Sequence, residues 1–297
     1  MSYEDGRLAS ATSLFYEYLV EEGMMQRSNS LTDFVELVRQ YDTWEWDANE
    51  NQKAKQLNDL FYLVSINEFE ERMVKRLTVT NSDVFEFDEF ERRLLEMEAD
   101  KIERYIRRKG REIVQQFIGD YCTGIVHAES YHSELGNALG KEHPHLDYIA
   151  ILGLGNKKIS FRTIHDDVDV SAIAGRFGGG GHAKAAGCPL DKDGFKLYVE
   201  EIFPLNPIRP DASRNVYNLR GTIKGCYYAS QDGGHFCVYG QSEKRWFVER
   251  NGLEIEIHFP SFNDAERHIK RHYGAFLTKD DAFVDFLINH CYNVTSK

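Results

Sequence analysis

Hydrophobic positions in the first third of the chain recur at helical spacing. The segment from Ala11 to Glu22 places its apolar residues on one face of a helix, and Gly23 is well placed to end it. Further helices are predicted over residues 31–39, 53–62 and 66–76. No segment of residues 1–80 shows the apolar run typical of a parallel strand. This region is therefore predicted to be mostly helical, which is unusual for an independent α/β domain.

A long, highly charged stretch follows, from Phe85 to Phe117. Its apolar residues lie near helical spacing, and Gly110 is the residue expected to break or bend the helix. A continuous helix of this length would span about 50 Å at about 1.5 Å per residue. We interpret the stretch as a solvated amphipathic linker between two lobes.

From Tyr121 the pattern changes to short apolar runs separated by turn residues. Strands are predicted over residues 123–128, 146–152 and 157–163. A helix is predicted over 132–141, another after the glycine run that follows, and another near 194–203. Three of the six prolines lie in residues 203–215, which marks a linker. The pattern predicts an α/β unit that ends at this linker.

The last part of the chain alternates strands and tight turns before it becomes helical. Asp232-Gly233 is a turn signal, and Asn251-Gly252 between apolar runs predicts a type I′ hairpin. Two helices are predicted over residues 263–272 and 279–291. The pattern predicts a small α+β module whose chemistry is not evident.

Composition narrows the class of protein. Apolar residues make up 42% of the chain and charged residues 28%, as in ordinary globular proteins. The net charge of −12 argues against a general nucleic-acid coat but leaves room for a small basic pocket. No apolar run reaches the ~18 residues of a membrane span, and the start lacks a secretory pattern. Five scattered cysteines without a C-x-x-C pair favour a reducing cytoplasm, with no membrane partner.

The most informative segment is the run of four glycines from Gly178 to Gly181. Without Cβ atoms this backbone adopts positive φ values, and several N–H groups converge on one anion. The following residues, His-Ala-Lys-Ala-Ala, favour a helix, so the run is predicted to lie at a helix N-terminus that binds phosphate. His182 is the first side chain available to donate to the anion. The alternative is a flexible surface loop, and no Walker Gly-Lys-Ser/Thr ending is present.

The segment VDVSAIAGRFGGGGHAKAAG, residues 168–187, resembles the signature of the DHH-associated domain of DHH-family phosphoesterases. That family includes RecJ-type exonucleases, oligoribonucleases and phosphatases of cyclic dinucleotides or pAp. The resemblance covers roughly residues 120–205. It implies that the glycines and His182 hold a substrate phosphate or nucleotide, together with Arg162 in KKISFRT. Arg176, just before the glycine run, is a further candidate for the phosphate pocket.

A weaker resemblance extends upstream. SATSLFYEYL, residues 10–19, resembles the helix after the D-H-H motif, and YDTWEW places Asp42 where the first lobe has its last metal-binding aspartate. These segments are most similar to the oligoribonuclease branch. The resemblance implies Mn²⁺ or Mg²⁺, hard cations that prefer oxygen ligands. Without the resemblance, the residue pattern favours a turn or helix-cap aspartate at Asp42.

The chain departs from the family pattern at its start. The D-x-D motif, a second aspartate and the D-H-H triplet are absent, and Met1–Arg7 supply no substitute. A hydroxide bridging two metals normally attacks the phosphorus in this chemistry, and one aspartate cannot hold two metals. We therefore expect a truncated and impaired chain that does not itself bind the metals of the intact enzyme.

The resemblance and the patterns together predict an α/β fold in four parts. These are the C-terminal part of a DHH lobe (1–84), a linker helix (85–119), the DHH-associated domain (120–205) and an α+β extension (206–297). The predicted activity is metal-dependent hydrolysis of short RNA or DNA oligonucleotides. The alternatives are a non-catalytic module that binds nucleotides or RNA ends, and hydrolysis of pAp, cyclic di-AMP or polyphosphate. Residues 1–80 alone are expected to expose apolar surface that favours a homodimer.

Overall fold

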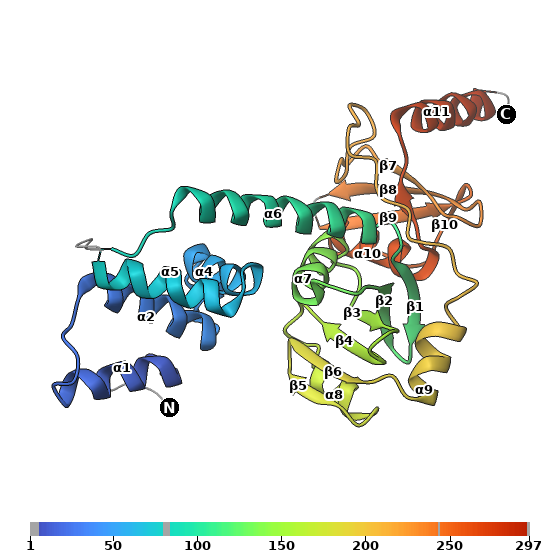
Figure 1. Ribbon diagram of the computed structural model, residues 1–297. Helices are drawn as coiled ribbons and strands as arrows, with labels where there is room; N and C mark the ends of the chain where they lie inside the picture. Colours follow the sequence, from blue (N-terminus) through green and yellow to red (C-terminus); the bar gives the residue numbers. More distant parts are fainter. Residues whose placement is uncertain (1–5, 80–83, 243, 296–297) are drawn as a thin grey trace. The chain divides into compact units, whose positions relative to one another are not determined.

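The computed structural model describes residues 6–79, 84–242 and 244–295. The chain divides into two compact units, residues 1–103 and 104–297 (Figure 1). The first unit is helical and the second contains both β-sheets. The fold is therefore mixed α/β, as predicted.

The first unit is a group of helices around one apolar core. The helices predicted from the sequence are all present, with bounds α1 Ala11–Glu21, α2 Asn29–Asp42, α3 Glu45–Ala48, α4 Gln52–Leu63 and α5 Ile66–Val79. Ser10 begins α1 with a capping box in which it exchanges hydrogen bonds with Ser13. The core includes Leu57 and Leu60 of α4 and Phe85 of the segment that follows α5. Outside an isolated bridge position at Leu8, the described residues of this unit contain no strand.

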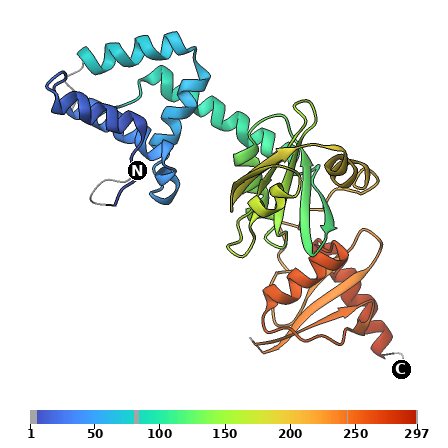
Figure 2. The same cartoon turned by 90° about the horizontal axis from the view of Figure 1, so that it is seen from below.

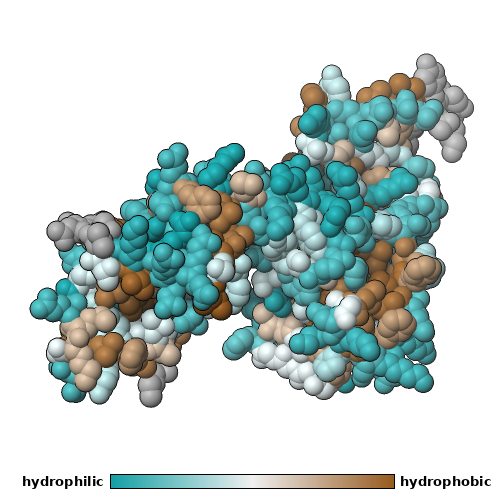
Figure 3. All heavy atoms as spheres, viewed as in Figure 1, coloured by the Kyte–Doolittle hydropathy of each residue, from teal (hydrophilic) through white to brown (hydrophobic). Residues whose placement is uncertain are grey.

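The apolar face of α1 is exposed rather than packed. Phe15 is 62% exposed and Tyr18 51%, whereas Ser13 and Tyr16 are the buried residues of this helix. Tyr62 and Ile66 are also exposed. Figure 3 shows apolar side chains at several places on the face of this unit. The expected exposure of apolar surface is confirmed, and the homodimer that it would favour stays a prediction.

The helix predicted over residues 85–117 is shorter than expected. Helix α6 runs from Glu89 to Lys109, and strand β1, Val114–Ile118, occupies what was predicted as the last turn of the helix. The N–H of Gly110 donates to the carbonyl of Ile106 at 2.8 Å, which closes the final turn. Ile113 is then buried in the core of the sheet, so the apolar residues after Gly110 belong to a strand. The prediction missed this because Ile113 also fits helical spacing.

The second unit begins with a six-stranded sheet in the order β1-β2-β3-β4-β6-β5 (Figures 1 and 2). Strands β2 and β3 are parallel and are joined by helix α7, His132–Glu142, and all other pairs are antiparallel. Helix α7 covers one face of the sheet. Helix α8, Val170–Gly175, and the π-helix η1, Lys196–Glu200, cover the other. The remaining bounds are β2 Tyr121–His127, β3 Tyr148–Gly153, β4 Lys158–Arg162, β5 Gly180–His182, β6 Ala185–Pro189 and α9 Lys192–Phe195.

A second sheet of five strands follows the proline-rich linker, in the order β10-β9-β8-β7-β11. Its bounds are β7 Cys226–Ala229, β8 His235–Ser242, β9 Arg245–Arg250, β10 Leu253–Glu254 and β11 Phe276–Leu277. Asn251 and Gly252 both have positive φ, 51° and 82°, so the predicted type I′ hairpin is confirmed. Helix α10, Phe262–Tyr273, packs on one face, and α11, Asp280–Thr295, stacks Phe286 on Tyr227 of the other.

Candidate phosphate-binding site

The glycine run does not begin a helix, so this part of the sequence prediction is wrong. Helix α8 ends at Gly175, just before the run, and the second half of the run already belongs to strand β5, which is followed by β6. Gly178 has φ +70°, its N–H donates to Gly175 at 3.2 Å, and the N–H of Gly179 donates to Ala174 at 3.0 Å. This is a Schellman motif, which closes a helix C-terminus. The alanines that favoured a helix instead pair with β4, because sheet pairing overrides helix propensity.

Two of the other glycines are required because the backbone at this point runs very close to β6. A Cβ on Gly179 would come within 2.1 Å of the carbonyl oxygen of Gly187. Gly181 has φ +147°, and its Cβ would meet the Ala185 carbonyl oxygen at 2.6 Å. Gly180, in contrast, faces open space. The run is therefore a structured turn and edge strand, which excludes the flexible-loop alternative.

Strand pairing brings Arg162 and His182 to the same face of the sheet. Arg162 of β4 pairs with Ala185 of β6, and Ala185 pairs with His182 of β5. Residues paired across neighbouring strands share a face, so the two cationic or hydrogen-bonding side chains flank the small Ala185. Two strand spacings separate them, about 10 Å between Cα atoms. The sequence prediction that they act together is consistent with this geometry.

The next row on the same face has almost no side-chain bulk. Ser160 pairs with Gly187, which pairs with Gly180. Helix α7 packs on β3 and β4, while Gly180 and His182 on β5 are exposed. We call this surface the glycine notch. Its floor consists of Ala185, Gly187 and Gly180, and it is flanked by Arg162, His182 and Ser160. Its flat backbone lets a ligand approach between Arg162 and His182.

Helix α7 positions Arg162, and the sequence prediction missed its contribution. The Arg162 guanidinium donates to the Ser133 hydroxyl at 3.0 Å and to the carbonyl of Phe161 at 2.9 Å. A Cβ on Gly136 would lie 2.5 Å from Arg162 Cγ, so this glycine makes room for the arginine stem. Burial lowers the pKa of Arg162, partly offset by the charge of Glu134. The group remains a cation because an arginine is protonated throughout the ordinary pH range.

The hydroxyl of Ser160 has a defined partner at the floor of the notch. His132 Nε2 lies 3.1 Å from the carbonyl oxygen of Ala128, and Nδ1 lies 2.9 Å from Ser160 Oγ. A carbonyl only accepts, so Nε2 carries the proton and, in the neutral imidazole, Nδ1 accepts from Ser160. The sequence pattern did not indicate Ser133, Gly136 or His132, because they belong to the crossover helix between β2 and β3 and are distant in sequence from the glycine run.

Substituting Gly136 tests how the arginine is held. We expect Gly136→Ala to lower the free energy of unfolding by about 1–3 kcal/mol, because the new methyl group overlaps the Arg162 stem. The control Gly175→Ala places a methyl group in open space on α8 and is expected to be neutral or stabilising by up to about 1 kcal/mol. Urea unfolding of both variants measures the difference. Equal effects would contradict the crowding at Gly136.

Arg176 is not brought together with the notch. It follows α8, which packs on the opposite face of the sheet, and it lies near the hydroxyls of Tyr148 and Tyr198. Burial raises the pKa of both tyrosines, and the charge of Arg176 opposes part of that rise. A role for Arg176 in phosphate binding stays a prediction without geometric support.

Asp42 is the last residue of α2 and borders a cavity of about 150 Å³ in the first unit. The cavity is mostly apolar, with Phe34, Leu57 and Phe61 in its walls. Burial raises the pKa of Asp42, the behaviour of a carboxylate without a compensating cation. Among the described residues no group of three metal-ligating side chains occurs. Asp42 therefore lacks the companions of a metal centre there, and Glu4 and Asp5 lie outside the described residues.

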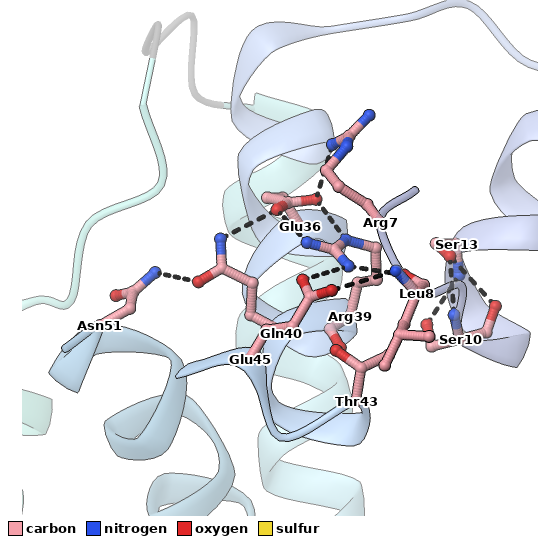
Figure 4. A network of polar contacts seen from close by, with 10 residues as sticks. All are labelled: Arg7, Leu8, Ser10, Ser13, Glu36, Arg39, Gln40, Thr43, Glu45 and Asn51. Carbon is pink, nitrogen blue, oxygen red and sulfur yellow. Dashed lines mark hydrogen bonds and ion pairs between the residues drawn. The ribbon is translucent and has the colours of Figure 1, made fainter. Parts of the chain in front are cut away.

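A buried ion-pair network fixes the turn that follows Asp42 (Figure 4). Arg39 is only 2% exposed and donates to Glu36 at 2.7 and 2.8 Å and to the Leu8 carbonyl at 2.6 Å. It also pairs with Glu45 of α3 at 2.6 Å. These hydrogen bonds lower the pKa of Glu36 and raise that of Arg39. The network ties α2, α3 and the start of the described chain together.

The relatives of this chain decide its family. Oligoribonuclease NrnB of Bacillus subtilis (strain 168) is 54% identical over 287 residues, which are 97% of this chain and 71% of that protein. The chain belongs to the NrnB family. The resemblance to DHH-type phosphoesterases is thereby confirmed. The family model described as the oligoribonuclease NrnB C-terminal domain matches residues 225–297, which hold the second sheet with α10 and α11. We call these residues the C-terminal module.

Solved structures give a much weaker likeness. An uncharacterized protein from Helicobacter pylori G27 is 19% identical with a TM-score of 0.29, over 66% of each chain. PggH from Vibrio cholerae, described as a pGpG-specific phosphodiesterase, is 14% identical with a TM-score of 0.29, over 47% of this chain and 50% of that one. A likeness at this level carries no argument about function. Of the helices in the described residues, none has the length and apolar character that crossing a bilayer requires.

Proposed function

We propose that this chain holds a phosphodiester of a short oligoribonucleotide in the glycine notch and serves the hydrolysis of that bond. The proposal rests on the strand pairing, which places Arg162 and His182 on either side of Ala185 on one face of the sheet, next to glycines without side chains. The name of the Bacillus relative, an oligoribonuclease, supports the substrate class. The net charge of −12 fits a substrate gripped at one small site rather than along a broad surface.

The two flanking side chains have the donors that such a ligand needs. A guanidinium has five N–H donors, and the two bonds from Arg162 to Phe161 and Ser133 leave three for a phosphate. Charge-assisted hydrogen bonds of this kind are about twice as strong as neutral ones. His182 is exposed and presents its ring nitrogens on the same face. Ala185 and the glycines let the sugar-phosphate backbone lie close to the sheet.

The family chemistry would use a divalent metal, Mn²⁺ or Mg²⁺, to supply an activated water, and Asp42 is our candidate ligand. The donor set in the described part of the chain does not fit a complete centre, since Asp42 is the one acidic residue that lines its cavity. The second candidate function is that the chain binds nucleotides or RNA ends without cleaving them, and product analysis with Mn²⁺ distinguishes the two.

Binding of a labelled, 5′-phosphorylated diribonucleotide tests the notch. We expect Arg162→Ala to weaken binding by about 10–100-fold, because a charge-assisted hydrogen bond contributes about 1.5–3 kcal/mol. His182→Ala is expected to weaken it about 10-fold. The matched control is Lys158→Ala, which removes a cation at the far end of the same strand and the same face. Fluorescence anisotropy measures the dissociation constants.

Equal losses in Arg162→Ala and Lys158→Ala would show general electrostatic attraction and contradict the notch. Product analysis after incubation with Mn²⁺ separates the two candidate functions. Cleavage above the level of His182→Ala supports the hydrolase, and tight binding without cleavage supports the binding module. Parallel arms with pAp and cyclic di-AMP identify which phosphoester the notch prefers.

A further inference from the structure

A cavity of about 540 Å³ lies within residues 104–297, at the sheet edge opposite to the glycine notch. Its floor is β1, and its walls are the proline-rich linker, the end of α10 and the turn between β7 and β8. The C-terminal module therefore supplies nearly half of the lining. The volume lies within the ~300–1,000 Å³ range of small-molecule sites.

An aromatic wall closes one side of this cavity. The rings of Phe117 and His272 are stacked, with centroids 5.6 Å apart and an interplanar angle of 17°. Phe117 is 39% exposed and His272 is exposed as well. The guanidinium of Arg271 lies 5.6 Å from the Phe117 ring. Parallel aromatic rings that remain accessible are platforms on which a further planar ring stacks.

The floor presents main-chain hydrogen-bonding groups. The carbonyl of Ile113 points away from the sheet, because it accepts from the N–H of Ile208 at 2.8 Å. Main-chain direction alternates along a strand, so the N–H and C=O groups of Gln115 and Phe117 also point outward from edge strand β1. The side-chain amides of Gln116 and Asn206 line the cavity and make no hydrogen bond to another described residue. These groups could pair with the edge of a heterocycle.

The charges in the lining are already engaged. Arg271 donates to Asp147 at 2.7 Å and to the His145 carbonyl at 2.9 Å. Asp232 accepts from the Ser230 hydroxyl and the Gly234 N–H. The charge of Arg271 is compensated by Asp147, and the carboxylate of Asp232 repels a phosphate. The cavity therefore favours a neutral planar ring with donors and acceptors on its edge.

We propose that the cavity between β1 and the C-terminal module is a second site that binds a nucleobase, stacked on the exposed side of the Phe117–His272 pair. The identity of the ligand as a nucleobase rests on the proposed function. Four strand spacings, about 19 Å, separate β1 from the floor of the notch on β6, so one dinucleotide does not occupy the notch and the cavity together. The base comes either from a free nucleoside or nucleotide, or from the far end of a longer oligonucleotide.

The test uses 2-aminopurine riboside, a fluorescent nucleoside without phosphate that is quenched when it stacks. We expect saturable quenching by the wild-type chain and equal quenching by Arg162→Ala. Phe117→Ala and His272→Ala are expected to weaken binding about 10-fold or more, since one base–aromatic stack contributes that much. Phe117→Trp keeps a stacking ring and is expected to bind. Phe195→Ala is the matched control, because Phe195 of α9 is similarly exposed, 41%, outside the cavity.

Circular dichroism and thermal unfolding establish that each variant is folded. His272→Ala and Gln116→Ala keep the test valid if Phe117→Ala fails to fold. A terminal 2-aminopurine quenched in a pentanucleotide but not in a dinucleotide identifies the distal base as the source. Absence of quenching, or an equal loss in Phe195→Ala, would overturn the second site. Loss of oligonucleotide binding in Phe117→Ala with none in Arg162→Ala would instead overturn the notch and leave the second site standing.

Discussion

Lowering the pH from 6.5 to 4 is expected to destabilise residues 104–297 by about 3 kcal/mol through His143 alone. Burial, reinforced by the charge of Lys270, lowers the pKa of His143 from 6.5 to about 4, and Asp211 offsets only part of this. Burial also lowers the pKa of His145 to about 2, helped by Lys270, His143, Arg271 and Arg267. Below pH 6.5 the unfolded chain binds protons that the folded chain excludes. The contribution of the neutral His143 to the free energy of unfolding is therefore fully present above pH 6.5 and is lost as the pH falls towards 4.

The His143→Phe variant isolates this effect from the titration of carboxylates. His143 Nε2 is buried without a hydrogen-bond partner, and its ring meets His145 edge to face, so a phenyl ring fits at little cost. We expect the slope of unfolding free energy against pH to fall by about 1.4 kcal/mol per pH unit between pH 6 and 4.5. Urea unfolding at several pH values measures the slope. A slope equal to that of the wild type would contradict the burial of a neutral His143.

Replacing Arg39 with alanine is expected to lower the stability of the first unit by about 2–4 kcal/mol. The substitution leaves Glu36, Glu45 and the Leu8 carbonyl without their shared donor, and removing one partner of a buried pair costs about 3–5 kcal/mol. We expect a loss of about 2–4 kcal/mol rather than about 3–5 kcal/mol because both glutamates are partly exposed, 33% and 23%. Trp44 and Trp46, close to the network, report the unfolding of this unit in a Trp246→Phe background.

Two further variants make the Arg39 experiment decisive. Arg93→Ala removes an arginine whose ion pair with Glu96 is exposed, and we expect a change below about 0.5 kcal/mol. Adding Glu36→Gln and Glu45→Gln to Arg39→Leu removes the unpaired charges and is expected to recover part of the loss. If Arg39→Ala were as mild as Arg93→Ala, the network would not hold the α2–α3 turn.

Most helices and strands could be predicted because their apolar positions repeat locally. The strand around Ile149 and the hairpin at Asn251-Gly252 are examples, since each depends on neighbouring residues only. The segment after Gly181 could not be predicted, because alanines favour a helix locally and pairing with β4 decides otherwise. Strand β1 was hidden in a helical pattern for the same reason. Local preference is weak compared with the burial gained by completing a sheet.

The candidate site was partly predictable for a similar reason. Arg162 and His182 were identified by their positions in a signature, and the register now places them on one face. Ser133 and Gly136 act on Arg162 from a helix about 25 residues upstream, and such contacts leave no periodic signal. Arg176 illustrates the opposite limit: it is adjacent in sequence to the glycines but lies on the other side of the sheet.

Strand β1 is an edge strand of its sheet, and the C-terminal module partly covers it. The Gln115 side chain donates to the carbonyls of Lys270 and Arg271 at 3.0 and 2.9 Å, and its amide oxygen lies 3.0 Å from His145 Nε2. A single glutamine thus satisfies orphan carbonyls at the end of α10 while it ties that helix to the sheet. Open strand edges invite pairing with other chains. A family member without this module would therefore need another feature that prevents β1 from pairing with a strand of another chain, such as a charged residue or a proline in β1.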